Sequence, residues 1–435
     1  MTPGFYIIMA AQFFSALADS ALLIAAIAIL RDMHASTAVE PLLKLFFTVS
    51  YVVLAAFVGA FADSMPKWRV MFISNGIKIV GCAMMFLGVH PLAAYAVVGL
   101  GAAAYSPAKY GILTELLPHR LLVVANGWIE GLTVGAIVFG TLVGGALIEP
   151  TVVQHVISLG IPGVDTRGEV AITVVGVLYV IASALNLRIP DTGVDHKPLR
   201  NNPIYLLHEF NHCVRLLWRD KLGQISLAVT TLFWGAGATL QFIVLKWAEE
   251  SLGMSLSEGA ILQAVVAVGV AGGAIAAAGR IPLKKSLTVL PVGIMMGIAV
   301  MLMAFYTRDL FPSDWVVHVG HLRVPVYLLI AYLFLMVVGA LSGYFVVPMN
   351  ALLQHRGHVL LSAGHSIAVQ NFNENLSVLV MLCLYAVLVW LDVPVGVVIV
   401  LFGTFVCLTM WLVIRRHQAN QRQFDSVALI GESKH

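Results

Sequence analysis

The chain has 435 residues, of which 60% are hydrophobic and only 11% are charged. A mean hydropathy of +0.93 excludes a water-soluble globular protein and indicates a polytopic membrane protein. The net charge of +3 gives no reason to expect a nucleic-acid partner, so the basic residues matter through their positions. Three of the four cysteines lie inside apolar runs, which does not suggest a disulfide framework.

Twelve apolar runs are each long enough to cross about 30 Å of hydrocarbon. The first has no basic segment before it and no clear cleavage site, so we expect a retained helix rather than a signal peptide. The predicted fold class is an all-α polytopic membrane protein of twelve transmembrane helices in two six-helix halves. The runs cover residues 5–30, 41–62, 70–88, 91–116, 122–148, 169–189, 222–245, 256–279, 286–305, 324–350, 360–390 and 394–414.

The placement of lysine and arginine predicts that both termini face the cytoplasm. With that orientation the inner connections hold 17 basic residues and the outer connections hold 4. The inner set is Lys67, Arg69, Arg120, Arg188, Lys197, Arg200, Arg215, Arg219, Lys221, Arg280, Lys284, Lys285, Arg356, Arg415, Arg416, Arg422 and Lys434, and the outer set is Arg31, Arg167, Arg308 and Arg323. Lys44, Lys78, Lys109 and Lys246 fall inside helices or at their ends.

The longest cytoplasmic connection, residues 190–221, divides the chain into an N-terminal half, 1–189, and a C-terminal half, 222–416. Its apolar residues recur at helical spacing, which suits an amphipathic helix on the inner membrane surface, although a plain linker is an equal alternative. The apolar positions are Leu207, Phe210, Val214 and Leu217. The polar cytoplasmic tail, 417–435, is predicted to be disordered.

The two halves echo one another. The fourth run carries Pro107 and Lys109, and the tenth carries Pro348 and Asn350 at the same spacing. This weak repeat is typical of the parallel six-plus-six arrangement of the major facilitator superfamily, in which sites lie between the halves.

The connection between the second and third runs contains Gly59, Asp63, Lys67 and Arg69. It resembles the superfamily's loop motif, in which a glycine allows close packing and the charged residues hold the cytoplasmic side in one state. Ser64 and Pro66 depart from that motif. We interpret the four residues as gating residues, with a merely solvated loop as the alternative.

The stretch GAAAYSPAKYGILTEL places Lys109 two residues after Pro107 in an apolar run. A lysine in hydrocarbon costs about 2.5–3.5 kcal/mol, which favours a functional role, and the proline is a candidate bend for gating. At 1.5 Å per residue, Lys109 and Glu130 both lie roughly 10–12 Å from the cytoplasmic side and can pair. Asp19, at about 22 Å, matches the level of Glu374 better. The alternative for Lys109 and Glu130 is a static buried ion pair, and the alternative for Asp19 is a solvated residue of the cavity wall.

Polar residues form stripes on the predicted helices, which lipid would not tolerate, so we expect them to line a wet central cavity. The stripes include Gln12, Ser15 and Asp19; Asn126, Glu130 and Thr133; Thr230, Trp234 and Gln241; and Gln370, Glu374 and Ser377. The glycines of the fifth run, with GTLVGG from Gly140 to Gly145, resemble the motif of drug/proton antiporters, but close helix packing explains them as well. A drug/proton antiporter is therefore the alternative function.

Five phrases together resemble the bacterial lysophospholipid transporter family of the major facilitator superfamily. They are AQFFSALADSALL, GAAAYSPAKYGILTEL, TLFWGAGATLQF, FVVPMNALLQ and AVQNFNENL. The resemblance covers essentially all twelve runs. It implies a flippase that moves lysophospholipids, mainly lysophosphatidylethanolamine, inward across the bacterial inner membrane. An acyltransferase/acyl-carrier-protein synthetase on the cytoplasmic face would then reacylate them.

By position, Asp19 and Lys109 match charged residues of the family's transport path. Gln241 stands where the family pattern has an arginine, so an Asp-to-Arg contact between helices one and seven is in doubt. We hypothesise that Lys109 meets the lipid phosphate with Glu130 holding it. The head-group amine would meet Asp19, Gln370 and Glu374, with Asn350 completing the predicted substrate-binding set.

Two enzyme signatures are absent from the sequence. No histidine is followed five residues later by aspartate, so the acyltransferase signature is absent, and no Gly-Lys dipeptide offers a P-loop for ATP. The fourteen histidines are not assigned to a metal site. We therefore expect a transporter without a cofactor or metal.

Overall fold

The computed structural model describes residues 2–34, 39–196, 198, 202–254, 256–312, 315–319 and 322–430. Lys197, Arg200 and Lys434, which the charge count places inside, lie outside the described residues. The first part of the chain forms α1 (Pro3–Asp32), α2 (Glu40–Val53), α3 (Ala55–Asp63), α4 (Lys67–Phe86), α5 (Pro91–Leu116), α6 (Leu122–Leu147), α7 (Pro150–Ser158) and α8 (Arg167–Asn186).

A connecting helix, α9 (Pro203–Arg219), leads to the second part of the chain. That part forms α10 (Gly223–Leu252), α11 (Leu256–Arg280), α12 (Leu290–Met303), α13 (Val326–Leu360), α14 (Ala363–Trp390) and α15 (Val395–Gln423). An antiparallel hairpin of β1 (Val316–Val319) and β2 (Leu322–Pro325) precedes α13. Short 3-10 segments are η2 (His119–Leu121), η3 (Leu283–Val289), η4 (Arg308–Leu310) and η5 (Ser426–Leu429).

Ten helices in the described part of the chain are long and apolar enough to cross a membrane. The pair α2 and α3, bent by 63° around Leu54, adds an eleventh. The remaining long helix, α5, has 26 residues and packs against α2 and α4. With α5 as a span, the bundle has the twelve-helix plan predicted from the sequence, and the expected second run is broken rather than straight.

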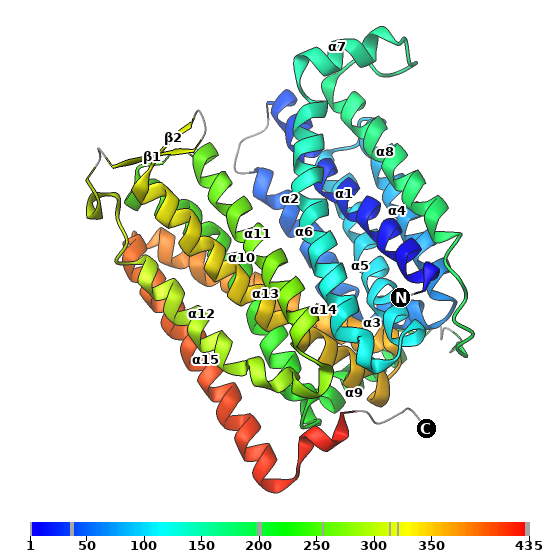
Figure 1. The fold of residues 1–435 in the computed structure, drawn as a ribbon. Coiled ribbons are helices and arrows are strands. Elements are labelled where there is room, and N and C mark those ends of the chain that lie inside the picture. Colours follow the sequence, from blue (N-terminus) through cyan, green and yellow to red (C-terminus); the bar gives the residue numbers. More distant parts are fainter. Residues whose placement is uncertain are drawn as a thin grey trace.

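Helices α1–α8 and α10–α15 form two halves (Figure 1). Within the first, α1 packs on α6 and α8, and within the second, α11 packs on α13 and α12 on α15. The halves meet at the end of the bundle where the chain begins and ends, which we call the terminal end. They diverge toward the opposite end, which carries α7 and the β1–β2 hairpin and is called the hairpin end.

The connection contains a helix, α9, which packs on the bundle. Its N-terminus is capped by Asn202, whose side chain accepts hydrogen bonds from two backbone N–H groups. Phe210 and Leu217 lie in its buried face, whereas Leu207 is 52% exposed. The face packs against α3 and α14, with Phe210 edge-on to Phe372 at 5.5 Å between ring centroids. The apolar side of α9 thus covers the terminal end of the bundle.

The predicted disorder of the tail is wrong for residues 417–430. Helix α15 continues to Gln423, nine residues past the predicted end at 414, and η5 follows it. Asn420 donates from Nδ2 to the carbonyl oxygen of Lys221 at 3.1 Å, and Ile430 is only 4% exposed. The tail folds because it is held on the terminal end by packing that local composition does not reveal.

Candidate functional site

Four of the predicted site residues form one hydrogen-bonded chain between the halves. Asn350 of α13 donates from Nδ2 to Glu130 Oε1 of α6 at 3.3 Å. Gln370 of α14 donates from Nε2 to Asn350 Oδ1 at 3.2 Å and to Glu374 Oε1 at 2.7 Å. All four side chains are at most 6% exposed. We call Glu130, Asn350, Gln370 and Glu374 the inter-half chain.

A second polar contact lies one helical turn closer to the terminal end. Asn126 and Gln354 exchange two amide hydrogen bonds, each of 2.9 Å, and both are essentially buried. Each residue lies four positions from a member of the inter-half chain on its own helix, and residues at this spacing share a face. Gln354 was missed from the sequence, although its spacing from Asn350 is a usable signal.

Lys109 does not form the expected ion pair with Glu130. Its Nζ lies 4.4 Å from the centroid of the Tyr110 ring, in cation–π geometry. Among the described residues, no carboxylate oxygen lies within 4.0 Å of this nitrogen. Pro107 lies inside α5 and is buried, where its ring removes one backbone donor. Lys109 and Glu130 are near enough to attract one another electrostatically, but comparable depth was insufficient to bring them into direct contact.

Asp19 is neutralised within its own half rather than being grouped with Glu374. Its Oδ2 lies 2.8 Å from Lys78 Nζ of α4, and its Oδ1 accepts a hydrogen bond from the Tyr179 hydroxyl of α8 at 2.5 Å. The Asp19 side chain is 23% exposed, whereas that of Lys78 is 1% exposed. The carboxylate therefore has one accessible side and one side held by a buried cation.

Lys78 is the main residue that the sequence-based site omits. Its Nζ also donates to Ser15 Oγ at 3.0 Å and lies 5.0 Å and 5.5 Å from the ring centroids of Tyr105 and Tyr179. Ser15 donates in turn to Asn75 Oδ1 at 2.8 Å. Because a buried charge needs a partner, the lysine in the apolar run 70–88 was itself the available signal.

Gln241 lies apart from Asp19. Its side chain is exposed and donates from Nε2 to Gln263 Oε1 of α11 at 2.9 Å. Gln263 returns a bond of the same length to the Gln241 carbonyl oxygen. The expected site residue Gln241 therefore contacts its own half.

The predicted gating residue Asp63 joins α3 to the start of α14 at the terminal end. Its carboxylate accepts hydrogen bonds from the backbone N–H groups of Gly364 and His365 at 2.8 and 3.1 Å, and contacts His365 Nδ1 at 2.7 Å. Lys67 Nζ lies 2.8 Å from Asp63 and 3.4 Å from Glu115 of α5. An anion at a helix N-terminus is favourable, so this cluster holds the two halves together.

Small residues allow α3 and the start of α14 to pack closely together. A Cβ added at Gly59 would lie 2.9 Å from the Ala368 Cβ, and one at Gly364 would lie 2.6 Å from Asp63 Oδ1. Arg69, by contrast, is exposed and stacks on Trp68 at 5.1 Å from the ring centroid, so it takes no part in the cluster. His365 and Glu115 were not predicted as members.

The glycines of α6 serve close packing where they contact α1. A Cβ at Gly140 would lie 2.5 Å from the Leu17 carbonyl oxygen, and one at Gly144 would lie 3.0 Å from that of Ala21. Both contacts are within one half. Helix packing therefore explains Gly140 and Gly144 of the antiporter-like pattern, whereas a Cβ at Gly145 would have no atom of the described residues within 4 Å.

Comparison with known proteins places these features in a family. The sequence profile of the Major Facilitator Superfamily matches residues 8–380. The chain is 39% identical over 396 residues to the lysophospholipid transporter LplT of Yersinia enterocolitica serotype O:8 / biotype 1B, a match that covers 91% of this chain and 89% of the relative. It is also 39% identical over 389 residues to LplT of Yersinia pestis (strain Pestoides F), covering 89% and 87%.

Solved structures with the same fold are distant in sequence. A bacterial homologue of the iron transporter ferroportin, in its outward-facing state, has a TM-score of 0.70 at 11% identity and covers 97% of this chain and 100% of its own. The human organic anion transporter MFSD10 has a TM-score of 0.70 at 14% identity, covering 95% and 100%. The major facilitator fold is thereby confirmed, and this chain belongs to the major facilitator superfamily and, within it, to the lysophospholipid transporter family.

Proposed function

We propose that this protein moves lysophospholipids, chiefly lysophosphatidylethanolamine, from the outer to the inner leaflet of a bacterial inner membrane by alternating access. The observation that carries the proposal is the buried inter-half chain, from Glu130 to Glu374, in a protein 39% identical to transporters named for lysophospholipids. Polar side chains at a contact between two halves must exchange partners when the halves separate. A zwitterionic head group offers the replacement partners.

The charges suit the two ends of that head group. Among the described residues, the Lys109 ammonium lies over a ring face and has no carboxylate in direct contact, so it is available to a phosphate. The carboxylates of Glu130 and Glu374 are held by amides alone within the inter-half chain, and Asp19 has an accessible side. A lipid ammonium can pair with any of these three, and Lys109 and the carboxylates stay in the proposed substrate-binding set.

Alternating access gives a role to the cluster of Asp63, Lys67, Glu115 and His365, which we call the terminal-end cluster. With both termini on the cytoplasmic side, the end held by Asp63 and Lys67 is the inner one. Release of substrate inward then requires the contacts of Asp63 with Gly364 and His365 to break. An acyltransferase/acyl-carrier-protein synthetase at the same face would consume the lysolipid and keep the inward movement favourable.

Pro107 is proposed to let α5 bend as the site changes sides. It removes a backbone hydrogen bond inside this helix, two residues before Lys109. A Pro107→Ala protein is expected to take up lysolipid several-fold more slowly than wild type. Unaltered uptake by this variant would remove the role.

Uptake of labelled lysophosphatidylethanolamine into vesicles containing the purified protein tests the function. Lys109→Ala and Glu130→Ala are expected to lower the rate at least tenfold, because each removes a head-group contact. Lys246→Ala is the matched control, since Lys246 is paired with Glu250 at 3.6 Å within α10. Wild-type rates in both site variants would contradict the proposal. Dye efflux driven by a proton gradient, without lysolipid uptake, would support the antiporter instead.

A further inference from the structure

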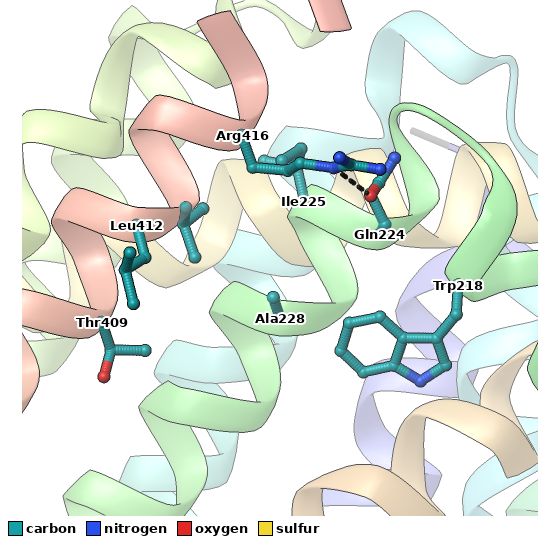
Figure 2. Close-up of a pocket in the computed structure, with 8 residues that line it drawn as sticks. Trp218, Gln224, Ile225, Ala228, Thr409, Leu412 and Arg416 are labelled. Atoms are coloured by element: carbon teal, nitrogen blue, oxygen red, sulfur yellow. Dashed lines mark hydrogen bonds between the residues drawn. The ribbon is translucent and has the colours of Figure 1, made fainter. Parts of the chain in front are cut away.

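A groove lies between α10 and α15, beside the end of α9. Its volume is about 210 Å³. Figure 2 shows Arg416 and Gln224 across one end, Trp218 on one side, and Leu412 and Thr409 on the other. It is lined by Trp218, Gln224, Ile225, Ala228, Thr409, Leu412, Val413 and Arg416. None of these residues belongs to the inter-half chain or to the terminal-end cluster.

The groove changes from apolar to basic along its length. Ile225, Ala228 and Leu412 form hydrocarbon walls, whereas Arg416 lies at the terminal end and donates from Nε to Gln224 Oε1 at 3.0 Å. Seven residues separate Thr409 from Arg416, which corresponds to about 10 Å along α15. An apolar groove with one basic end matches the part of a lipid where an acyl chain joins the phosphate head group.

The position of the groove suits the edge of a bilayer. Both α10 and α15 are long and apolar enough to cross a membrane, and the lining residues Trp218 and Leu412 are exposed. Arg415 and Arg416 are the first charged residues after the apolar run 394–414. Arginine at such a boundary reaches lipid head groups.

We propose that this groove binds one anionic phospholipid, of the phosphatidylglycerol type, with an acyl chain along its apolar walls and the phosphate on Arg416. Arg416 is the one charged residue in its lining, and no carboxylate there can receive the ammonium of a zwitterionic head group. The nearby Asp220 is already neutralised, because Arg356 Nη2 lies 2.7 Å from its Oδ1 in a buried pair. Charge complementarity thus favours a net negative head group.

The chain supplies a matched control in the adjacent residue. The Arg415 guanidinium stacks over Trp411 at 5.2 Å from the ring centroid and does not line the groove. Replacing either arginine by glutamine removes one positive charge from the same turn of α15. Only the loss of Arg416 removes the charge from the groove itself.

Native mass spectrometry of the purified full chain, with phosphatidylglycerol and phosphatidylcholine at equal concentrations, tests the proposal. We expect one phosphatidylglycerol to be retained preferentially, Arg416→Gln to weaken its binding about fivefold, and Arg415→Gln to leave it unchanged. Ala228→Leu and Thr409→Leu, which narrow the groove without changing charge, are each expected to weaken it as well.

Two results would overturn the site. One is equal loss of phosphatidylglycerol in the two arginine variants, which would mean a diffuse attraction to the basic end of α15. The other is retention without preference between the two lipids in the wild-type protein. Thermal unfolding in detergent checks that each variant is folded, and because Thr409 is only part-buried, its variant keeps the test valid if Ala228→Leu is unstable.

Discussion

Two polar clusters in this protein use charge in opposite ways. The Asp19 cluster lies within one half and balances a carboxylate with the buried ammonium of Lys78. The inter-half chain spans both halves, and within it the carboxylates of Glu130 and Glu374 accept hydrogen bonds from amide side chains. A contact inside a half survives when the halves move as rigid bodies, whereas a contact between them must break.

The energies of the two clusters fit this division. Removing one member of a buried ion pair costs about 3–5 kcal/mol, because the other charge is left without a partner. A single hydrogen bond contributes only about 0.5–1.5 kcal/mol net. The Asp19–Lys78 pair is thus suited to a permanent role and the inter-half chain to a reversible one.

The largest effect is expected from breaking the permanent pair. Asp19→Asn leaves Lys78 buried beside a neutral side chain, and we expect a loss of about 3 kcal/mol in the free energy of unfolding, measured by denaturant unfolding in detergent micelles. The double variant Asp19→Asn, Lys78→Met should recover most of that loss. A single variant as stable as the wild type would show that the pair carries little energy.

Asp63→Asn should give a somewhat smaller effect at the contact between the halves. Losing the charge weakens its contacts with Lys67, His365 and the α14 N-terminus by about 2 kcal/mol, so the terminal end opens more often. Labelling of a cysteine placed at Gly111 should become roughly thirtyfold faster. Arg69→Gln is the control, because Arg69 is exposed and outside the cluster; the same increase in that variant would contradict this account.

Asn350→Leu should separate stability from transport. It breaks the link between Glu130 and Gln370, which costs about 1–3 kcal/mol of stability, while lysolipid uptake falls at least tenfold. Vesicle uptake and unfolding measured on the same preparation compare the two quantities. Uptake that falls no more than the folded fraction would mean that Asn350 is only structural.

The smallest effect is expected at Gln241. Its side chain is exposed, and among the described residues it forms a hydrogen bond only with Gln263. Gln241→Ala should therefore change stability by less than about 0.5 kcal/mol and uptake by less than about twofold. A tenfold loss of uptake would return Gln241 to the substrate-binding set.

Hydropathy and charge predicted the helical bundle well, since charged residues bound most of the apolar runs. Polar residues in those runs also pointed to the inter-half chain, because buried polar groups need partners. The partners themselves were harder to predict. Depth along a helix gave similar levels for Lys109 and Glu130, but rotation about the helix axis decides which side chains meet. Lys78 was missed because its partner, Asp19, lies 59 residues away in sequence.

Cross-linking across the terminal end tests the central claim, that this end must open in every transport cycle. A Cβ at Gly111 of α5 would lie 3.3 Å from the Ala363 Cβ of α14, close to the separation of about 3.5–4.5 Å found in disulfides. The pair Gly111→Cys, Ala363→Cys is made in a background without Cys82, Cys213, Cys383 and Cys407. Oxidation should stop lysolipid uptake, and reduction should restore it. Full uptake by the cross-linked protein would contradict the account.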